Sequence, residues 1–233
     1  MNITVNPKTT RTAASLGRYS NVAIAFHWTI AAVLILQVFI GWRLEDLEPA
    51  ARSLFLQLHR TVGVAILLLT LGRLAWRLTN PPPPQHDQIK PLEHKLAHLV
   101  HVVFYGLMLG LPLTGWAMAS MERAGSLKLL GALKWPAFPL VSALPGALQD
   151  SLAGVFNNLH SALVWVMLAL VALHVAAALK HHFITRDPTL SRMAPGVKPG
   201  AFDPRLAIIP AAAPPATATT PRAAASRSTA TTR

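Results

Sequence analysis

Four long apolar runs divide the chain, over about residues 19–42, 54–78, 92–121 and 151–182. A transmembrane helix needs about 20 predominantly apolar residues, so each run is long enough to cross a bilayer. The pattern therefore predicts an all-α membrane protein built as a bundle of four transmembrane helices.

The first two runs differ in how charged residues interrupt them. The first has no charged residue from Tyr19 to Trp42 and is too long for the apolar part of a typical signal peptide, so we expect an uncleaved helix. In the second, only 12 uncharged residues separate Arg60 from Arg73. This helix can span only if Arg60 extends to the membrane surface or pairs with an anion there.

Polar segments between and beyond the runs predict the domain limits. We expect a polar segment over residues 1–18, one membrane domain over 19–195, and a disordered tail rich in Ala, Pro and Thr over 196–233. The NPPPP stretch at 80–84 cannot be helical. Residues 122–150 form a long loop, which we expect in the membrane interface or over one end of the bundle.

Composition narrows the class of protein. The chain is 52% hydrophobic and only 13% charged, against about 25% charged in soluble domains. The absence of cysteine excludes disulfides, thiolate metal sites and a covalently attached C-x-x-C-H haem. The net charge of +12 comes from Lys and Arg in loops and tails, which indicates topogenic charge and no nucleic-acid partner.

The distribution of Lys and Arg predicts the orientation. The N-terminal segment carries three, residues 72–95 carry four and residues 180–198 carry four, and a four-helix path places these eleven on one side. The opposite side has six. Because the cytoplasmic side is richer in Lys and Arg, both termini should be cytoplasmic.

Histidines fall at two depths of this predicted bundle. His160 and His174 lie 14 residues apart in the fourth run, about 21 Å along a helix and on nearly the same face. The orientation places His27 and His174 near the cytoplasmic face, and His59 and His160 near the outer face. The topology thus predicts two pairs, His27 with His174 and His59 with His160.

Paired imidazoles at two depths indicate two redox centres. A haem iron with two axial imidazoles has no open coordination position and serves to pass electrons. Small residues near these histidines would let a porphyrin approach the backbone, although they also aid packing in membrane helices. Two other interpretations stay open: histidines that only hydrogen-bond within the core, and a haem-free, histidine-lined metal or proton carrier.

The third run carries three further histidines near its start. His94, His98 and His101 are spaced by four and three residues, so they share one helix face near the inner level. They could compete with His27 for a metal or form a separate metal or proton site. We favour a simpler interpretation, in which they contact haem propionates or water.

Five stretches carry a resemblance to a known family. They are FHW around His27, LHRTVG around His59, NLHSAL around His160, KLAHLVHVVFYGLMLGLPLTGW in the third run, and ALHVAAALKHHFITRDPTLSRMAP at the end. Together these stretches, within about residues 18–195, resemble the bacterial cytochrome b561 family, also described as the cytochrome b subunit family of nickel–iron hydrogenases. The chain departs from the family in its longer N-terminal segment and in the tail after about residue 200.

The resemblance implies a four-helix bundle in the bacterial inner membrane that binds two haem b groups. The family's axial ligands map onto His27, His59, His160 and His174. Some small members resemble superoxide:quinone oxidoreductases, in which ubiquinone or another quinone lies beside the first histidine of an HH pair. That residue is His181 here.

The resemblance is compatible with two functions, which have to be distinguished. The first is electron transfer to or from quinone by the protein alone, with superoxide as a possible donor; Arg60 would then help an anion at the outer face or bind a haem propionate. The second is a membrane anchor that passes electrons between quinone and a redox partner protein, such as a hydrogenase or a soluble cytochrome. Membrane lipid surrounds the protein in both.

Overall fold

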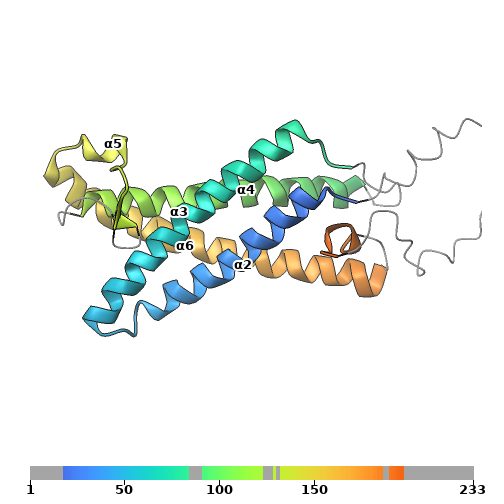
Figure 1. Ribbon diagram of the computed structural model, residues 1–233, viewed down its shortest axis with the longest axis horizontal. Coiled ribbons are helices and arrows are strands. Elements are labelled where there is room, and N and C mark those ends of the chain that lie inside the picture. Colours follow the sequence, from blue (N-terminus) through green and yellow to red (C-terminus); the bar gives the residue numbers. More distant parts are fainter. Residues whose placement is uncertain (1–17, 84–90, 123–127, 130–131, 186–188, 197–233) are drawn as a thin grey trace, which may run out of the picture. The chain divides into compact units, whose positions relative to one another are not determined.

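The computed structural model describes residues 18–83, 91–122, 128–129, 132–185 and 189–196. Its main elements are the four helices α2 (Asn21–Arg43), α3 (Pro49–Thr79), α4 (Pro91–Met121) and α6 (Gly146–Leu179) (Figure 1). All four are long and apolar enough to cross a membrane, which confirms the predicted four-helix fold class. Residues 1–17 and the tail from 197, together with Arg186 and Asp187, lie outside the described residues.

Local chemistry sets the helix starts, and two of them precede the predicted positions. The Ser20 hydroxyl caps α2 by accepting a hydrogen bond from the backbone N–H of Ala23 at 3.2 Å. Helix α3 starts at Pro49, five residues before the apolar run, because proline is well suited to the first helical position. Helix α6 starts at Gly146 and so precedes its apolar run by a similar length. Apolarity marks the part of a helix that can lie in lipid, and the helix itself can extend further.

A short irregular region connects α4 to α6. It contains a two-stranded antiparallel ribbon, β1 (Lys128–Leu129) with β2 (Leu133–Lys134), and the short helix α5 (Pro139–Ser142). Trp116 near the end of α4 donates a hydrogen bond from its indole Nε1 to the Pro136 carbonyl at 2.8 Å. The connecting region therefore covers the end of α4.

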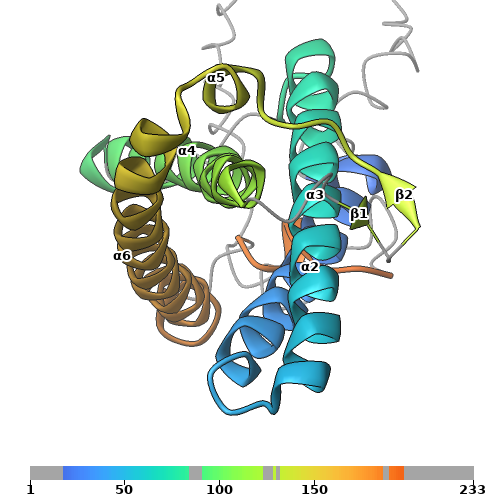
Figure 2. The same ribbon diagram turned by 90° about the vertical axis from the view of Figure 1, so that its left-hand side faces the viewer.

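The helices pack as two pairs joined through one contact. Helix α2 packs against α3, α4 packs against α6, and α3 packs against α4. Figure 2 shows the α2–α3 pair on one side and the α4–α6 pair on the other. Helix α6 makes no comparable backbone contact with α2 or α3. Side chains, or a group held by side chains, must therefore connect α6 to those two helices.

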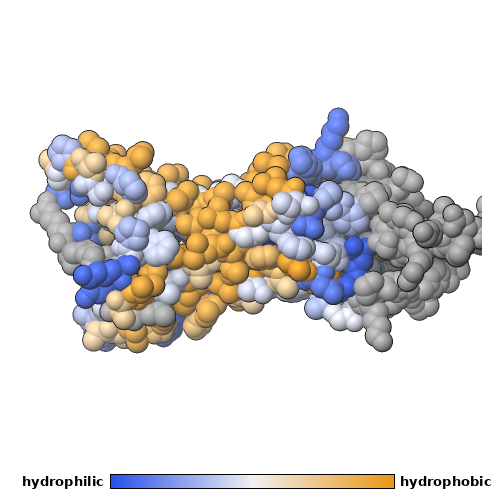
Figure 3. Space-filling model, turned by 45° about the horizontal axis from the view of Figure 1, so that its top comes forward, coloured by the Kyte–Doolittle hydropathy of each residue, from blue (hydrophilic) through white to orange (hydrophobic). Residues whose placement is uncertain are grey.

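An apolar layer fills the middle of the bundle. Its buried residues are Ile30 of α2, Leu107 and Met108 of α4, and Met167 of α6. Figure 3 shows a hydrophobic band between more hydrophilic ends on the face that it presents. Large apolar side chains are also exposed on the helices, such as Ile35 at 72% and Trp165 at 65%. Such exposure suits a surface that faces lipid, and the chain is an integral membrane protein.

Candidate functional site

One histidine pair lies at the end of the bundle that holds the start of α2. His27 of α2 faces His174 of α6, with 6.3 Å between the centroids of the imidazole rings. Both side chains are half-buried. Phe104 of α4 contacts His174 edge-on, with the ring centroids 5.4 Å apart. We call this the inner pair.

A second pair lies at the other end. His59 of α3 faces His160 of α6, and the ring centroids are again 6.3 Å apart. Both of these side chains are half-buried too. We call this the outer pair. The structure thus brings together the same partners that topology predicted, across helices that do not pack closely against each other.

The spacing in both pairs fits a metal between two axial imidazoles. Two metal–nitrogen bonds of about 2.0–2.1 Å plus the half-width of each ring place the ring centroids about 6 Å apart. The described residues contain no group of three His, Cys, Asp or Glu side chains arranged to hold a metal ion. A metal held by only two side chains needs further ligands, and a porphyrin supplies four. The two pairs therefore fit haem.

Thr114 orients the imidazole of His160. Its hydroxyl donates to the carbonyl of Leu111 at 2.8 Å, and the hydroxyl oxygen lies 2.8 Å from His160 Nδ1. Because the hydroxyl proton is already used, its oxygen accepts from Nδ1–H. The lone pair of His160 is then on Nε2, which is the tautomer that a metal ligand requires. Thr114 is buried.

Gln37 and Gly41 of α2 shape the surroundings of His59. The amide Nε2 of Gln37 donates to the His59 carbonyl at 3.0 Å and lies 3.2 Å from its Nε2. Among the described residues, none is a hydrogen-bond partner of the buried ring nitrogen Nδ1 of His59. A Cβ at Gly41 would lie 3.3 Å from the His59 ring, so the absence of a side chain there makes room for the imidazole.

The inner pair has two further neighbours. Arg73 of α3 places its Nη1 3.3 Å from His27 Nδ1. His101 of α4 lies with its ring centroid 6.0 Å from that of His174, nearly as close as His27. His101 is exposed, however, whereas the four paired histidines are half-buried. The alternative in which His101 competes with His27, which we did not favour from the sequence, thus has a geometric basis.

A carboxylate forms an ion pair with Arg60, the residue next to His59 of the outer pair. Arg60 pairs with Glu122 at the end of α4, and its side chain is 20% exposed. The expected anionic partner near the membrane surface is therefore a protein carboxylate. A role for Arg60 in binding a haem propionate stays a prediction.

His181 and its neighbours lie at the end of α6 that carries His174. Helix α6 ends at Leu179 and continues as a π-helical turn over Lys180–Thr185, which contains His181. Lys180 pairs with Glu93 of α4 at 3.6 Å, so this turn lies near the start of α4. His94 and His98 line a shallow surface pocket there with Lys95.

Residue spacing identified the histidines but missed the residues that surround them. Gln37, Arg73 and Thr114 each lie on a different helix from the histidine that they approach. Spacing along one helix carries no signal for such contacts. Only Arg73 carried a signal that could have found it, since it is a charged residue near the end of an apolar run.

The fold and the two histidine pairs define a class: a four-helix membrane protein with paired histidines at two depths. The sequence profile of the prokaryotic cytochrome b561 family matches residues 18–196. The chain belongs to this family of membrane electron-transfer proteins, whose cofactor is b-type haem.

Known relatives agree with this assignment. The chain is 31% identical to "Probable superoxide oxidase CybB" of Yersinia pestis over 182 residues, which cover 76% of the chain and 96% of the relative. It is 28% identical to "Cytochrome b561 homolog 2" of Escherichia coli K12 over 187 residues, with 76% and 90% covered. "Cytochrome b561 homolog 1" of the same strain is 29% identical over 188 residues, with 77% and 98% covered.

Proposed function

We propose that this protein carries electrons across the bacterial inner membrane through two haem b groups. His27 and His174 hold one haem, and His59 and His160 hold the other. The observation that carries the proposal is the equal 6.3 Å spacing of the two ring pairs. When bound, each haem supplies a one-electron carrier with no open coordination position.

The chain's own residues orient the ligands and keep water out. Thr114 fixes the tautomer of His160, and Phe104 covers one edge of His174. The buried layer around Met167 lies between the two levels. Met167 is seven residues from each α6 histidine, about 10 Å along the helix. The two centres are then separated by packed apolar side chains.

The ligand assignment is tested by reduced-minus-oxidised spectra together with a measurement of the number of haems per protein. We expect two haems per protein in the wild type and one in each of His174→Ala and His59→Ala, because each change removes one axial ligand. His101→Ala is the matched control and should keep two. A wild type without a b-type α-band would contradict the whole proposal and favour a haem-free carrier. Loss of a haem in His101→Ala, with both haems kept in His27→Ala, would move the inner ligand from His27 to His101.

The finer proposal is superoxide:quinone oxidoreduction, which similarity to the Yersinia relative supports. Two superoxide anions each give up one electron and become O2. One quinone takes up the two electrons and two protons and becomes quinol. We place superoxide oxidation at the outer pair and quinone at the inner end beside His181. Arg60, paired with Glu122 near His59, is the residue that would bind an outer propionate.

Quinol formation on addition of superoxide to the purified protein tests this version. We expect quinol in the wild type and much less in His181→Ala with both haems retained. No quinol from a wild type with two reducible haems would contradict it. The anchor function would then gain support from a hydrogenase or soluble cytochrome that co-purifies and reduces the haems.

A further inference from the structure

Arg73 contacts His27 in a way that is incompatible with metal ligation. A guanidinium group can only donate hydrogen bonds, so its contact at 3.3 Å uses the lone pair of His27 Nδ1. The ring proton of a neutral imidazole is then on Nε2. No lone pair remains for a metal. For His27 to become a ligand, the Arg73 guanidinium has to move away.

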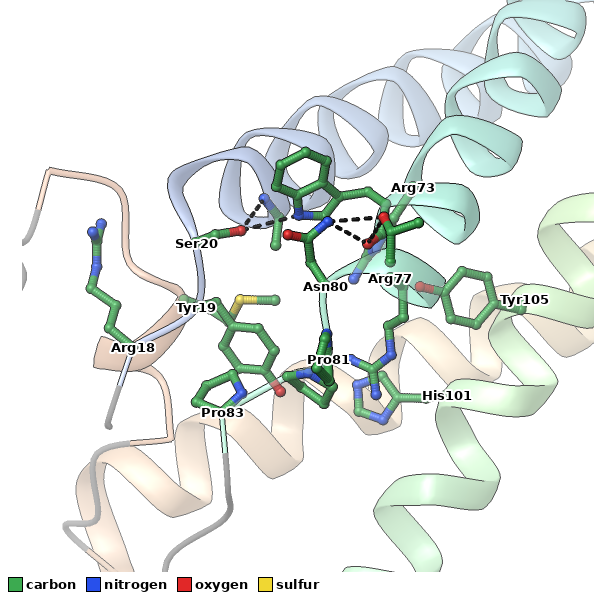
Figure 4. Close-up of a pocket in the computed structure, with 15 residues that line it drawn as sticks. Arg18, Tyr19, Ser20, Arg73, Arg77, Asn80, Pro81, Pro83, His101 and Tyr105 are labelled. Atoms are coloured by element: carbon green, nitrogen blue, oxygen red, sulfur yellow. Dashed lines mark hydrogen bonds between the residues drawn. The ribbon is translucent and has the colours of Figure 1, made fainter. Parts of the chain in front are cut away.

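A cationic pocket lies next to this contact. It has a volume of about 540 Å³ and is lined by Arg73 and Arg77 of α3, His101 and Tyr105 of α4, and Arg18 before α2. Figure 4 shows Arg73, Arg77, His101 and Tyr105 at one end and Arg18 with Tyr19 at the other. Within the described part of the chain, no Asp or Glu lines this pocket. Clustered cations at a partly buried site favour an anion among them.

The pocket walls are held in place by packing and hydrogen bonds. The guanidinium carbon of Arg73 lies 5.8 Å from the centroid of the Tyr105 ring. Three successive carbonyls, of Arg192, Met193 and Ala194, accept hydrogen bonds from the Tyr19 backbone N–H, Trp28 Nε1 and Arg18 Nη2. Met193 itself lines the pocket. The segment around it closes one side.

We propose that this pocket binds the propionate carboxylates of the inner haem, and that Arg73 exchanges His27 for a propionate when haem binds. The proposal rests on the proposed function, since it requires a haem between His27 and His174. A guanidinium binds a carboxylate through two parallel hydrogen bonds. The exchange frees a lone pair on His27 and gives the Arg73 charge a partner. Arg77, one helical turn further on, provides the second cation.

A redox titration of the full-length protein with its haems tests whether the charge of Arg73 acts on the inner haem. Arg73→Gln should lower the inner midpoint potential, because removal of a nearby cation disfavours the reduced state. We expect about a tenfold shift in the reduction equilibrium, which is about 59 mV for one electron. Arg73→Lys should restore most of it. Arg52→Gln, at the exposed far end of α3, is the matched control and should leave both potentials unchanged. His174→Ala identifies which potential is the inner one.

A second measurement separates propionate from other anions, such as a lipid phosphate. The rate of inner-haem loss to apomyoglobin is compared for native haem and for haem dimethyl ester, whose propionates are capped. Arg73→Gln should speed the loss of native haem roughly tenfold, the low end of the usual effect of losing an outer-shell partner. It should not change the loss of the ester. Equal acceleration with both would overturn the proposal in favour of another anion.

The outcomes distinguish this inference from the function on which it rests. A wild type with no b-type haem removes the proposed function, and this proposal with it. If the wild type holds two haems, and neither Arg73→Gln nor Arg77→Gln changes the inner midpoint potential or the rate of haem loss, only this proposal is overturned. Arg77 lines the pocket and, among the described residues, makes no hydrogen bond to His27 such as Arg73 makes, so its variant tests the pocket even if Arg73→Gln assembles poorly.

Discussion

Single hydrogen bonds decide which histidines are ready to bind a metal. Thr114 gives His160 the tautomer with a free Nε2 lone pair. Gln37 instead donates toward Nε2 of His59, and Arg73 donates toward Nδ1 of His27. These two donors occupy lone pairs that a metal would take. Two of the four pair members are therefore held by donors that would have to move before those histidines could bind a metal.

Thr114→Val should weaken the outer haem and leave the inner one unchanged. The change keeps the shape of the side chain but removes the acceptor for His160 Nδ1–H, so the tautomer is no longer fixed. Loss of such a partner typically costs about 10–100-fold in metal affinity. Haem content and the outer midpoint potential measure the effect.

Ser151→Ala is the control for this change. The Ser151 hydroxyl also donates to a carbonyl of its own helix, that of Ala147 at 3.0 Å, and the residue is exposed near the start of α6. It should keep both haems. An unchanged outer haem in Thr114→Val would show that packing alone orients His160.

The histidines themselves could be predicted from the sequence, and their immediate partners could not. A polar residue in an apolar run stands out, and helix direction assigns His59 and His160 to one depth. The partner of His160, however, is a threonine on α4, and threonine is common in membrane helices. The start of α3 at Pro49 was missed because residues 49–53 are too polar to mark a span, yet nothing in them opposes a helix.

At the scale of elements, the segment between α4 and α6 is held by an aromatic cluster. Trp116 contacts Trp135 and Phe138, with ring centroids 5.8 and 5.0 Å apart. The backbone N–H of Phe138 also donates to the Ser120 hydroxyl at 2.9 Å. Apolar side chains at the tips, Leu133 and Leu140, are 63% and 78% exposed. The segment therefore has a fixed attachment to α4 and an apolar surface of its own.

Trp116→Phe should loosen this attachment. The ring is kept, but the hydrogen bond from Nε1 to the Pro136 carbonyl is lost, at a cost of about 1 kcal/mol or about fivefold in local opening. Trypsin cleavage after the exposed Lys134 measures the opening. Trp42→Phe, at an exposed end of α2 with a ring 63% exposed, is the control and should not change the rate. If trypsin cleaves Trp116→Phe no faster than Trp42→Phe, the packing of the Trp116 ring, and not its hydrogen bond, holds the segment to α4.

At the scale of the whole molecule, two histidine pairs lie at two levels of one apolar span. The inner level gathers Arg73, Arg77 and His101 around His27 and His174. At the outer level, Arg60 follows His59 in the sequence and is already paired with Glu122. Cations near a haem favour its reduced state, so this asymmetry predicts a higher potential at the inner level. Electrons that enter at the outer pair would then move inward spontaneously.

Reporter fusions test the orientation that this direction assumes. Because Lys and Arg are eleven to six in favour of the side with both termini, we expect those termini in the cytoplasm. A C-terminal fluorescent protein should fluoresce and a C-terminal alkaline phosphatase should be inactive, whereas phosphatase fused after Pro145 should be active. The opposite result would exchange the inner and outer faces. The pairing itself would survive, since His174 faces His27 and His160 faces His59 whichever side is cytoplasmic.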